Sequence, residues 1–78
     1  MPHFYFDIWD GESLAVDEEG LDLNNQRTAE LEAVLSLADI AKELETFASI
    51  DCLAIEVRNA GGLILRVTFA CERVQPLS

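Results

Sequence analysis

The sequence predicts an α+β fold, in which one helix covers one face of a four-stranded, mainly antiparallel sheet in the order β-β-α-β-β. Three observations lead to this prediction. Apolar and polar residues alternate near both ends of the chain, as in half-buried strands. A long central segment lacks Gly and Pro and is rich in Ala, Leu and Glu, which favours a helix. Glycine-containing turn segments follow the first and third predicted strands, as hairpins require.

The first two strands are expected to form a hairpin. Residues 3–9 alternate with a period of two, and residues 14–16 form a short return strand. Asp10 and Gly11 between them predict a tight turn, because Gly tolerates a positive φ and Asp bonds to its own backbone. The side chains expected in the core from this hairpin are Phe4, Phe6 and Ile8.

The helix is expected over residues 26–47, with Asn24 or Asn25 as its N-terminal cap. At 3.6 residues per turn, one apolar stripe runs along it. That stripe consists of Leu31, Val34, Leu35, Ala38, Ala41, Leu44 and Ala48. Leu37, Ile40 and Phe47 widen the apolar surface beyond what packing on one sheet requires, so we expect the helix to make a second contact.

The last two strands, residues 53–58 and 63–72, are expected to form a second hairpin around the loop at residues 59–62. Glu56 and Arg66 are expected to pair across it. The residues expected to face the core are Leu53, Ile55, Val57, Leu63, Leu65, Val67, Phe69 and Cys71. The other sheet face is unusually apolar and is a second candidate for self-association. It is expected to carry Tyr5, Trp9, Ala54, Ile64 and Ala70.

Length and charge narrow the function classes. Seventy-eight residues form one domain, expected over residues 1–74 with a tail at 75–78, and so small a core gains from self-association. The net charge of −10, with five scattered Lys and Arg residues, argues against binding nucleic acid or an anionic membrane. No secretory signal or membrane-spanning apolar run is recognisable, so a cytoplasmic location is expected. Cys52 and Cys71 lack a zinc or CxxC spacing and are expected to be free thiols.

The acidic turns of the first hairpin are the one candidate for a ligand site. Their carboxylates could converge on a divalent cation, although their spacing does not match an EF-hand loop. The weak candidates for metal ligands are Asp10, Glu12, Asp17, Glu18 and Glu19. We assign no catalytic residue and no cofactor, because His3 is the only histidine and no nucleophile has a base beside it in the expected fold.

Four segments carry a family resemblance: YFDIWDG, VDEEG, LADIAKEL and LAIEVRN. Through them the chain, over residues 1–72, resembles a family of short single-domain proteins of unknown function from rhizobia and related alphaproteobacteria. The resemblance implies a compact cytoplasmic domain and carries over no activity, cofactor or catalytic residue. A looser likeness is to antitoxins with the HicB-type partial fold, in which a strand-turn-strand with an Asp-Gly turn precedes an Ala-rich helix.

The sequence therefore favours a non-enzymatic protein-protein interaction or regulatory module that acts as a homodimer. The candidate interface residues are Leu37, Ile40, Phe47, Tyr5, Trp9 and Ile64. One alternative is a domain that binds a small ligand or divalent cation through the acidic turns. Another is an antitoxin-like acidic regulator that binds a basic protein.

Overall fold

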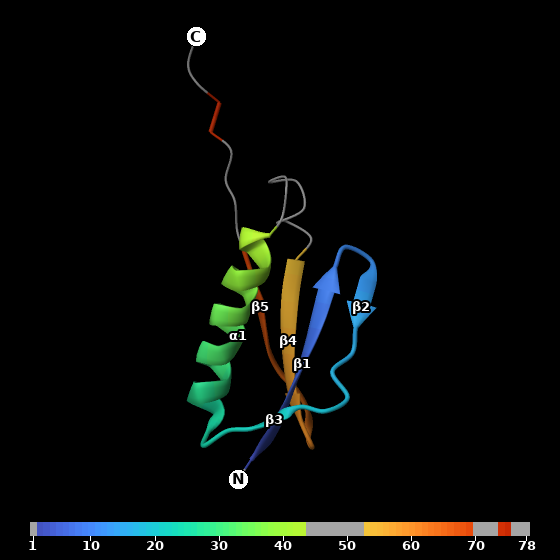
Figure 1. Ribbon diagram of the computed structural model, residues 1–78, viewed down its shortest axis with the longest axis vertical. Helices are drawn as coiled ribbons and strands as arrows, with labels where there is room; N and C mark the ends of the chain where they lie inside the picture. Colours follow the sequence, from blue (N-terminus) through green and yellow to red (C-terminus); the bar gives the residue numbers. More distant parts are fainter. Residues whose placement is uncertain (1, 44–52, 70–73, 76–78) are drawn as a thin grey trace.

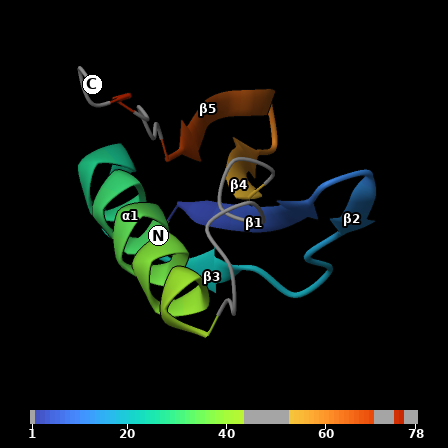
Figure 2. The same cartoon turned by 90° about the horizontal axis from the view of Figure 1, so that it is seen from above.

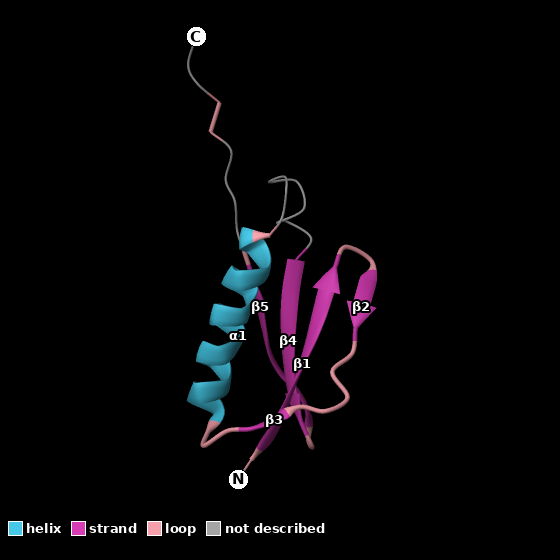
Figure 3. Ribbon diagram, in the orientation of Figure 1, coloured by secondary structure: helices cyan, strands magenta, loops and turns pink. Residues whose placement is uncertain are grey.

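A computed structural model, which describes residues 2–43, 53–69 and 74–75, confirms the α+β class. One helix, α1 (Gln26–Lys42), lies across one face of an antiparallel sheet (Figures 1 and 3). The strands are β1 (His3–Asp10), β2 (Ser13–Ala15), β3 (Leu21–Asp22), β4 (Leu53–Asn59) and β5 (Gly62–Thr68).

The sheet has the order β2-β1-β4-β5, seen nearly end-on in Figure 2. Both expected hairpins are confirmed, and antiparallel pairing of β1 with β4 joins them into one sheet. Strand β3 is an addition that the sequence did not predict. It pairs with His3 and Phe4 of β1, on the edge that β2 occupies farther along the strand. The edge of β1 is therefore shared by two short strands and the loop between them.

The turn of the first hairpin follows the expected chemistry. Asp10 pairs with Ser13, which leaves Gly11 and Glu12 as the two central residues. Gly11 has a φ of 65°, and a positive φ at the first central position is typical of a type II′ turn. In the second hairpin, Asn59 pairs with Gly62.

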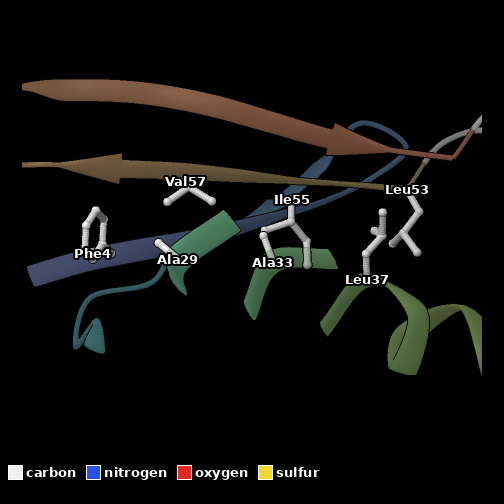
Figure 4. Packing of buried hydrophobic residues seen from close by; sticks show 7 residues of the cluster. All are labelled: Phe4, Ala29, Ala33, Leu37, Leu53, Ile55 and Val57. Atoms are coloured by element: carbon white, nitrogen blue, oxygen red, sulfur yellow. The ribbon is translucent and has the colours of Figure 1, made fainter. Parts of the chain in front are cut away.

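The core lies between α1 and the centre of the sheet. Ala29, Ala33 and Leu37, each one turn from the next, face the strands in Figure 4. On the sheet side, Leu53, Ile55 and Val57 of β4 are at most 2% exposed, as alternation predicted. Burial of each such side chain contributes about 1.5–3 kcal/mol. The residues that complete the buried cluster or pack against it from β1 are Phe4, Phe6 and Ile8.

The helix begins as expected. Asn25 is its N-cap, and the Asn25 side-chain oxygen accepts a hydrogen bond of 2.9 Å from the backbone N–H of Thr28. The helix ends at Lys42, with Glu43 as its C-cap, before the expected end at Phe47. Residues 44–47 lie outside the described residues, as do Cys52 and Cys71. In the part of the chain that the structure describes, no helix is long and apolar enough to cross a membrane.

The buried side of the helix differs from the expected stripe. Leu31, Val34 and Leu35, which were expected to face the sheet, are 50–58% exposed. Leu37, expected in a surplus contact, is 1% exposed at the centre of the core, and Ile40 packs against that core. The helix is apolar on two sides, so periodicity alone could not say which side faces the sheet. The side with Ala29 and Ala33 faces it, since small side chains let the helix backbone approach the strands closely.

A β-bulge corrects the orientation of two residues in β5. Val57 pairs with Leu65 but Arg58 pairs with Leu63, so Ile64 is an extra residue in the ladder. The extra residue reverses the alternation before it. Leu63 is therefore 62% exposed rather than in the core, while Ile64 packs against the core rather than on the outer sheet face.

Candidate functional site

The acidic loop between β2 and β3 makes hydrogen bonds that stabilise the edge of the sheet. On this edge of β1, β3 pairs with His3 and Phe4, and β2 pairs with residues 8–10. Asp17 lies beside the stretch between them, which has no strand partner. The Asp17 Oδ2 atom accepts a hydrogen bond of 3.1 Å from the backbone N–H of Phe6. Its Oδ1 atom accepts from the N–H groups of Glu19 and Gly20 at 3.1 and 3.0 Å. The carboxylate thus replaces the missing strand partner and closes the loop on itself.

Asp7 and Arg58 anchor this loop from the outer face of the sheet. Asp7 is 7% exposed, and its Oδ1 atom accepts a hydrogen bond of 2.9 Å from the backbone N–H of Asp17. Arg58 donates from Nε to Asp7 Oδ2 at 2.8 Å and from Nη2 to the carbonyl oxygen of Asp17 at 2.8 Å. The guanidinium also lies 4.4 Å from the centre of the Tyr5 ring. The hydrogen bond to Asp7 raises the pKa of Arg58.

These contacts keep Asp17 ionised. Partial desolvation works to raise the pKa of Asp17. The N–H groups of Gly20, Phe6 and Glu19 and the charge of Arg58 outweigh it, so the net effect is a lowered pKa.

His3 holds the other end of the loop. Its Nδ1 atom lies 2.5 Å from Asp22 Oδ1, and its Nε2 atom lies 2.7 Å from the carbonyl oxygen of Glu19. Both partners are acceptors, so the protonated ring, with an N–H on each nitrogen, satisfies both contacts. The bond to Asp22 and then the bond to the Glu19 carbonyl raise the pKa of His3. Gly20 has a φ of 69°, and an added Cβ would lie 2.7 Å from the Phe4 carbonyl oxygen, so the turn requires Gly.

The acidic residues do not converge as a cation site would require. The Asp17 carboxylate accepts hydrogen bonds from backbone N–H groups, whereas Glu19 is exposed and only its backbone carbonyl contacts His3. Asp10, Glu12 and Glu18 are exposed. Among the described residues, no group of three or more His, Cys, Asp or Glu side chains is placed to hold a metal ion.

A second network of side-chain hydrogen bonds lies on the outer face of the sheet. Glu56 lies opposite Arg66, as expected, and accepts a hydrogen bond of 2.6 Å from it. Glu56 also accepts a bond of 2.7 Å from the indole N–H of Trp9, and that bond, then Arg66, lowers the pKa of Glu56. An open hollow of about 500 Å³ lies beside this network. Residues that line it include Trp9, Glu12, Ala54, Arg66 and Thr68. Trp9 and Tyr5 are half-buried in these contacts, so this face is less available than its composition suggested.

The helix side away from the sheet is the main exposed apolar feature. Its residues, hereafter the apolar outer face, are Leu31, Val34, Leu35 and Ala38. The first three are 58%, 50% and 54% exposed. The four recur at the spacing of successive turns and therefore form one continuous stripe. Among the described residues, the other exposed large hydrophobic side chains are Leu14 of β2, Leu21 of β3 and Leu63 of β5, with Val16, Phe69 and Val74 outside the strands.

Sequence reasoning found the residues of this face but assigned them to the core, and it placed Leu37 and Ile40 on the surplus side instead. Phe47, the remaining helix candidate, lies outside the described residues. The pairing of Asp7 with Arg58 was also missed. Its one signal is a charged residue within each of two apolar strands, Asp7 inside β1 and Arg58 near the end of β4, 51 residues apart.

Comparison with known proteins identifies a family to which no activity has been assigned. A family model described as Domain of unknown function (DUF6894) matches residues 3–70. No curated protein and no solved structure matches the chain.

Proposed function

The chain belongs to the family described as Domain of unknown function (DUF6894), and we propose that it acts as a non-enzymatic protein-protein interaction module in the form of a homodimer. The observation that carries the proposal is the apolar outer face. A surface helix normally presents charged and polar residues to solvent, so a second apolar side favours a further partner that covers it. The sheet covers one side of α1 only.

The charge distribution favours a second copy on this face. Two chains of net charge −10 repel each other most strongly where their acidic loops approach. The apolar outer face contains no carboxylate, and Arg27 and Lys42, two of the five basic residues, lie on the same side of the helix. It is therefore a surface where two copies can approach with little repulsion. Covering it also extends the core of a domain whose size limits burial.

The proposal keeps two further expectations from the sequence. The family resemblance supports a bacterial origin, and the same resemblance supports a cytoplasmic setting. If the protein is a regulator rather than a purely structural dimer, we expect the dimer to bind a further partner through its remaining surface.

Sedimentation equilibrium at micromolar concentrations tests the dimer. The wild-type chain of 8.7 kDa is expected at twice that mass. A Leu31→Glu/Leu35→Glu variant is expected to raise the dissociation constant at least about tenfold, which corresponds to about 1.4 kcal/mol. Charges on this face would have to be buried without partners in the dimer.

The matched control is Leu63→Glu, the same chemical change at a residue that is 62% exposed on the opposite side of the sheet. It is expected to leave the mass unchanged, and circular dichroism verifies that both variants fold. A wild-type chain that sediments as a monomer throughout the micromolar range overturns the proposal. A dimer that Leu63→Glu dissociates and Leu31→Glu/Leu35→Glu does not would place the interface elsewhere.

A further inference from the structure

We propose that the free edge of β5, at residues 65–68, binds an extended segment of a basic partner protein as a further strand of the sheet. One Arg side chain of that segment lies in the hollow beside Trp9. This inference goes beyond the proposed homodimer, which uses the helix, and does not depend on it. Strand addition takes its affinity from main-chain hydrogen bonds and its selectivity from pockets for individual side chains.

Strand β5 lies at the end of the sheet, whose order is β2-β1-β4-β5 (Figure 2). Within the described residues, β4 is the only strand that pairs with it. No residue of β5 is buried, whereas β4, with a neighbour on each side, has Leu53, Ile55 and Val57 at most 2% exposed. An edge strand carries a row of backbone N–H and C=O groups that are available to another chain.

The two edges of the sheet differ in their protection. On the other edge, β2 and β3 are three and two residues long, and the Asp17 carboxylate binds the N–H of Phe6 between them. Short strands and charged side chains at an edge prevent strand addition. Strand β5 contains no Pro, Lys or acidic residue. Its bulge at Ile64 precedes residues 65–68, which keep a regular ladder with residues 54–57 and can therefore pair with a further strand.

The hollow of about 500 Å³ lies next to this regular stretch. Arg66 and Thr68 of the edge strand line it, together with Ala54, Trp9 and Glu12. These residues come from β5, β4, β1 and the turn after β1, so the hollow extends from the edge across the outer face of the sheet. In an added strand, every second side chain points to this face. Because Ala54 and Thr68 are small, a long side chain can lie over them and extend toward Trp9.

The chemistry of the hollow favours a guanidinium group. Trp9 is held in place by its hydrogen bond of 2.7 Å to Glu56, and an indole ring attracts a cation to its face. Glu12 is exposed, and no ion pair to it is found among the described residues. The charge of Arg66 is already paired with Glu56 at 2.6 Å. A carboxylate and an aromatic ring are therefore available to an Arg side chain.

Charge also favours a basic segment over a second copy as the occupant of this edge. The net charge of −10 attracts a basic chain to the molecule as a whole. The β5 strand of a second copy would offer one basic residue, Arg66, and that side chain is held by Glu56 of its own chain.

A peptide of alternating Arg and Val, end-capped and about eight residues long, tests the proposal, since it suits an extended strand. It is added to the isotopically labelled full chain. NMR is expected to show slowed amide exchange within residues 65–68 and shifted signals of the Trp9 indole and of Glu12. A matched peptide of alternating Glu and Val is expected not to bind.

Two comparisons separate strand pairing from simple attraction between charges. Glu12→Gln is expected to weaken binding of the Arg peptide about threefold, as loss of an exposed ion pair predicts. Glu18→Gln, the same change at an exposed acid of the loop between β2 and β3, is expected to leave the affinity unchanged. An Arg peptide that is N-methylated at every residue keeps its charges but cannot donate backbone hydrogen bonds, and it is expected not to bind.

Binding without slowed exchange at residues 65–68, undiminished binding of the N-methylated peptide, or equal losses in Glu12→Gln and Glu18→Gln would overturn the proposal, as would no binding at millimolar peptide. Slowed exchange at residues 65–68 in the free chain that increases with protein concentration would place a second copy on this edge and overturn the basic segment as its occupant. Sedimentation of the helix variants tests the homodimer separately, so either proposal can fail without the other.

Discussion

At the scale of single residues, the acidic side chains of β1 and of the loop between β2 and β3 stabilise the fold. The Asp17 carboxylate accepts hydrogen bonds from three backbone N–H groups, one at the edge of β1 (Phe6) and two in the loop (Glu19 and Gly20). Asp7 accepts a hydrogen bond from the N–H of Asp17 itself. Arg58 of β4 pairs with the Asp7 carboxylate and donates to the backbone carbonyl oxygen of Asp17.

Replacement of Asp7 by Ala is expected to lower the free energy of unfolding by about 2 kcal/mol, in the range of hydrogen bonds to charged groups. It leaves the N–H of Asp17 and the half-buried Arg58 guanidinium without their partner. Urea denaturation measures the loss. Asp10→Ala, at an exposed position in the same strand, serves as the control and is expected to change the stability by less than about 0.5 kcal/mol. Equal losses in the two variants would contradict the bracing role of Asp7.

His3 makes the stability of the loop depend on pH. Its pKa is raised in the folded chain, first by Asp22 and then by the Glu19 carbonyl, above the ordinary value of 6.5. The imidazolium therefore contributes its full stabilisation below about pH 6.5, and the contribution is lost as the pH rises through the raised pKa.

Chemical denaturation between about pH 6 and pH 9 is expected to show this decline, which His3→Gln should abolish. An NMR titration of the ring gives the folded pKa directly. A midpoint at or below 6.5 would contradict the assignment of both ring nitrogens as donors.

At the scale of elements, two local features redirect side chains that periodicity placed elsewhere. Helix α1 has apolar residues on both sides, and the side with Ala29, Ala33 and Leu37 faces the sheet. In β5, the bulge at Ile64 reverses the alternation of the residues before it. Both features arise where a sequence pattern permits two arrangements and contacts with other elements select one.

The bulge predicts opposite responses at two neighbouring positions. Ile64→Thr is expected to lower the free energy of unfolding by about 1–2 kcal/mol, because the hydroxyl enters the edge of the apolar core and two carbon groups are lost. Leu63→Thr, at a position 62% exposed, is expected to change it by less than about 0.5 kcal/mol. Thermal and urea unfolding of both variants measure the difference. The reverse order would indicate a regular ladder without the bulge.

At the scale of the whole molecule, charge and apolar surface are separated. The network of Asp7, Asp17 and Arg58 lies at the loop and the outer sheet face, whereas the apolar outer face lies on the helix. An acidic surface keeps copies apart except where carboxylates are absent. This separation is why the proposed dimer uses the helix, and why the sheet network, already paired internally, is a weaker candidate for the interface.

The sequence by itself determined the helix and four of the five strands, both hairpins and the buried face of β4, and it narrowed the helix cap to Asn24 or Asn25. These depend on local rules: a period of two, turn residues and a free first turn of a helix. It also revealed that the helix has more apolar surface than one sheet can cover. Only the tertiary structure decided which side of α1 is buried, that Ile64 rather than Leu63 turns inward, and that Asp7, Asp17 and Arg58 meet. The physical reason is that these outcomes depend on contacts between residues far apart in the chain, and local patterns are compatible with more than one of them.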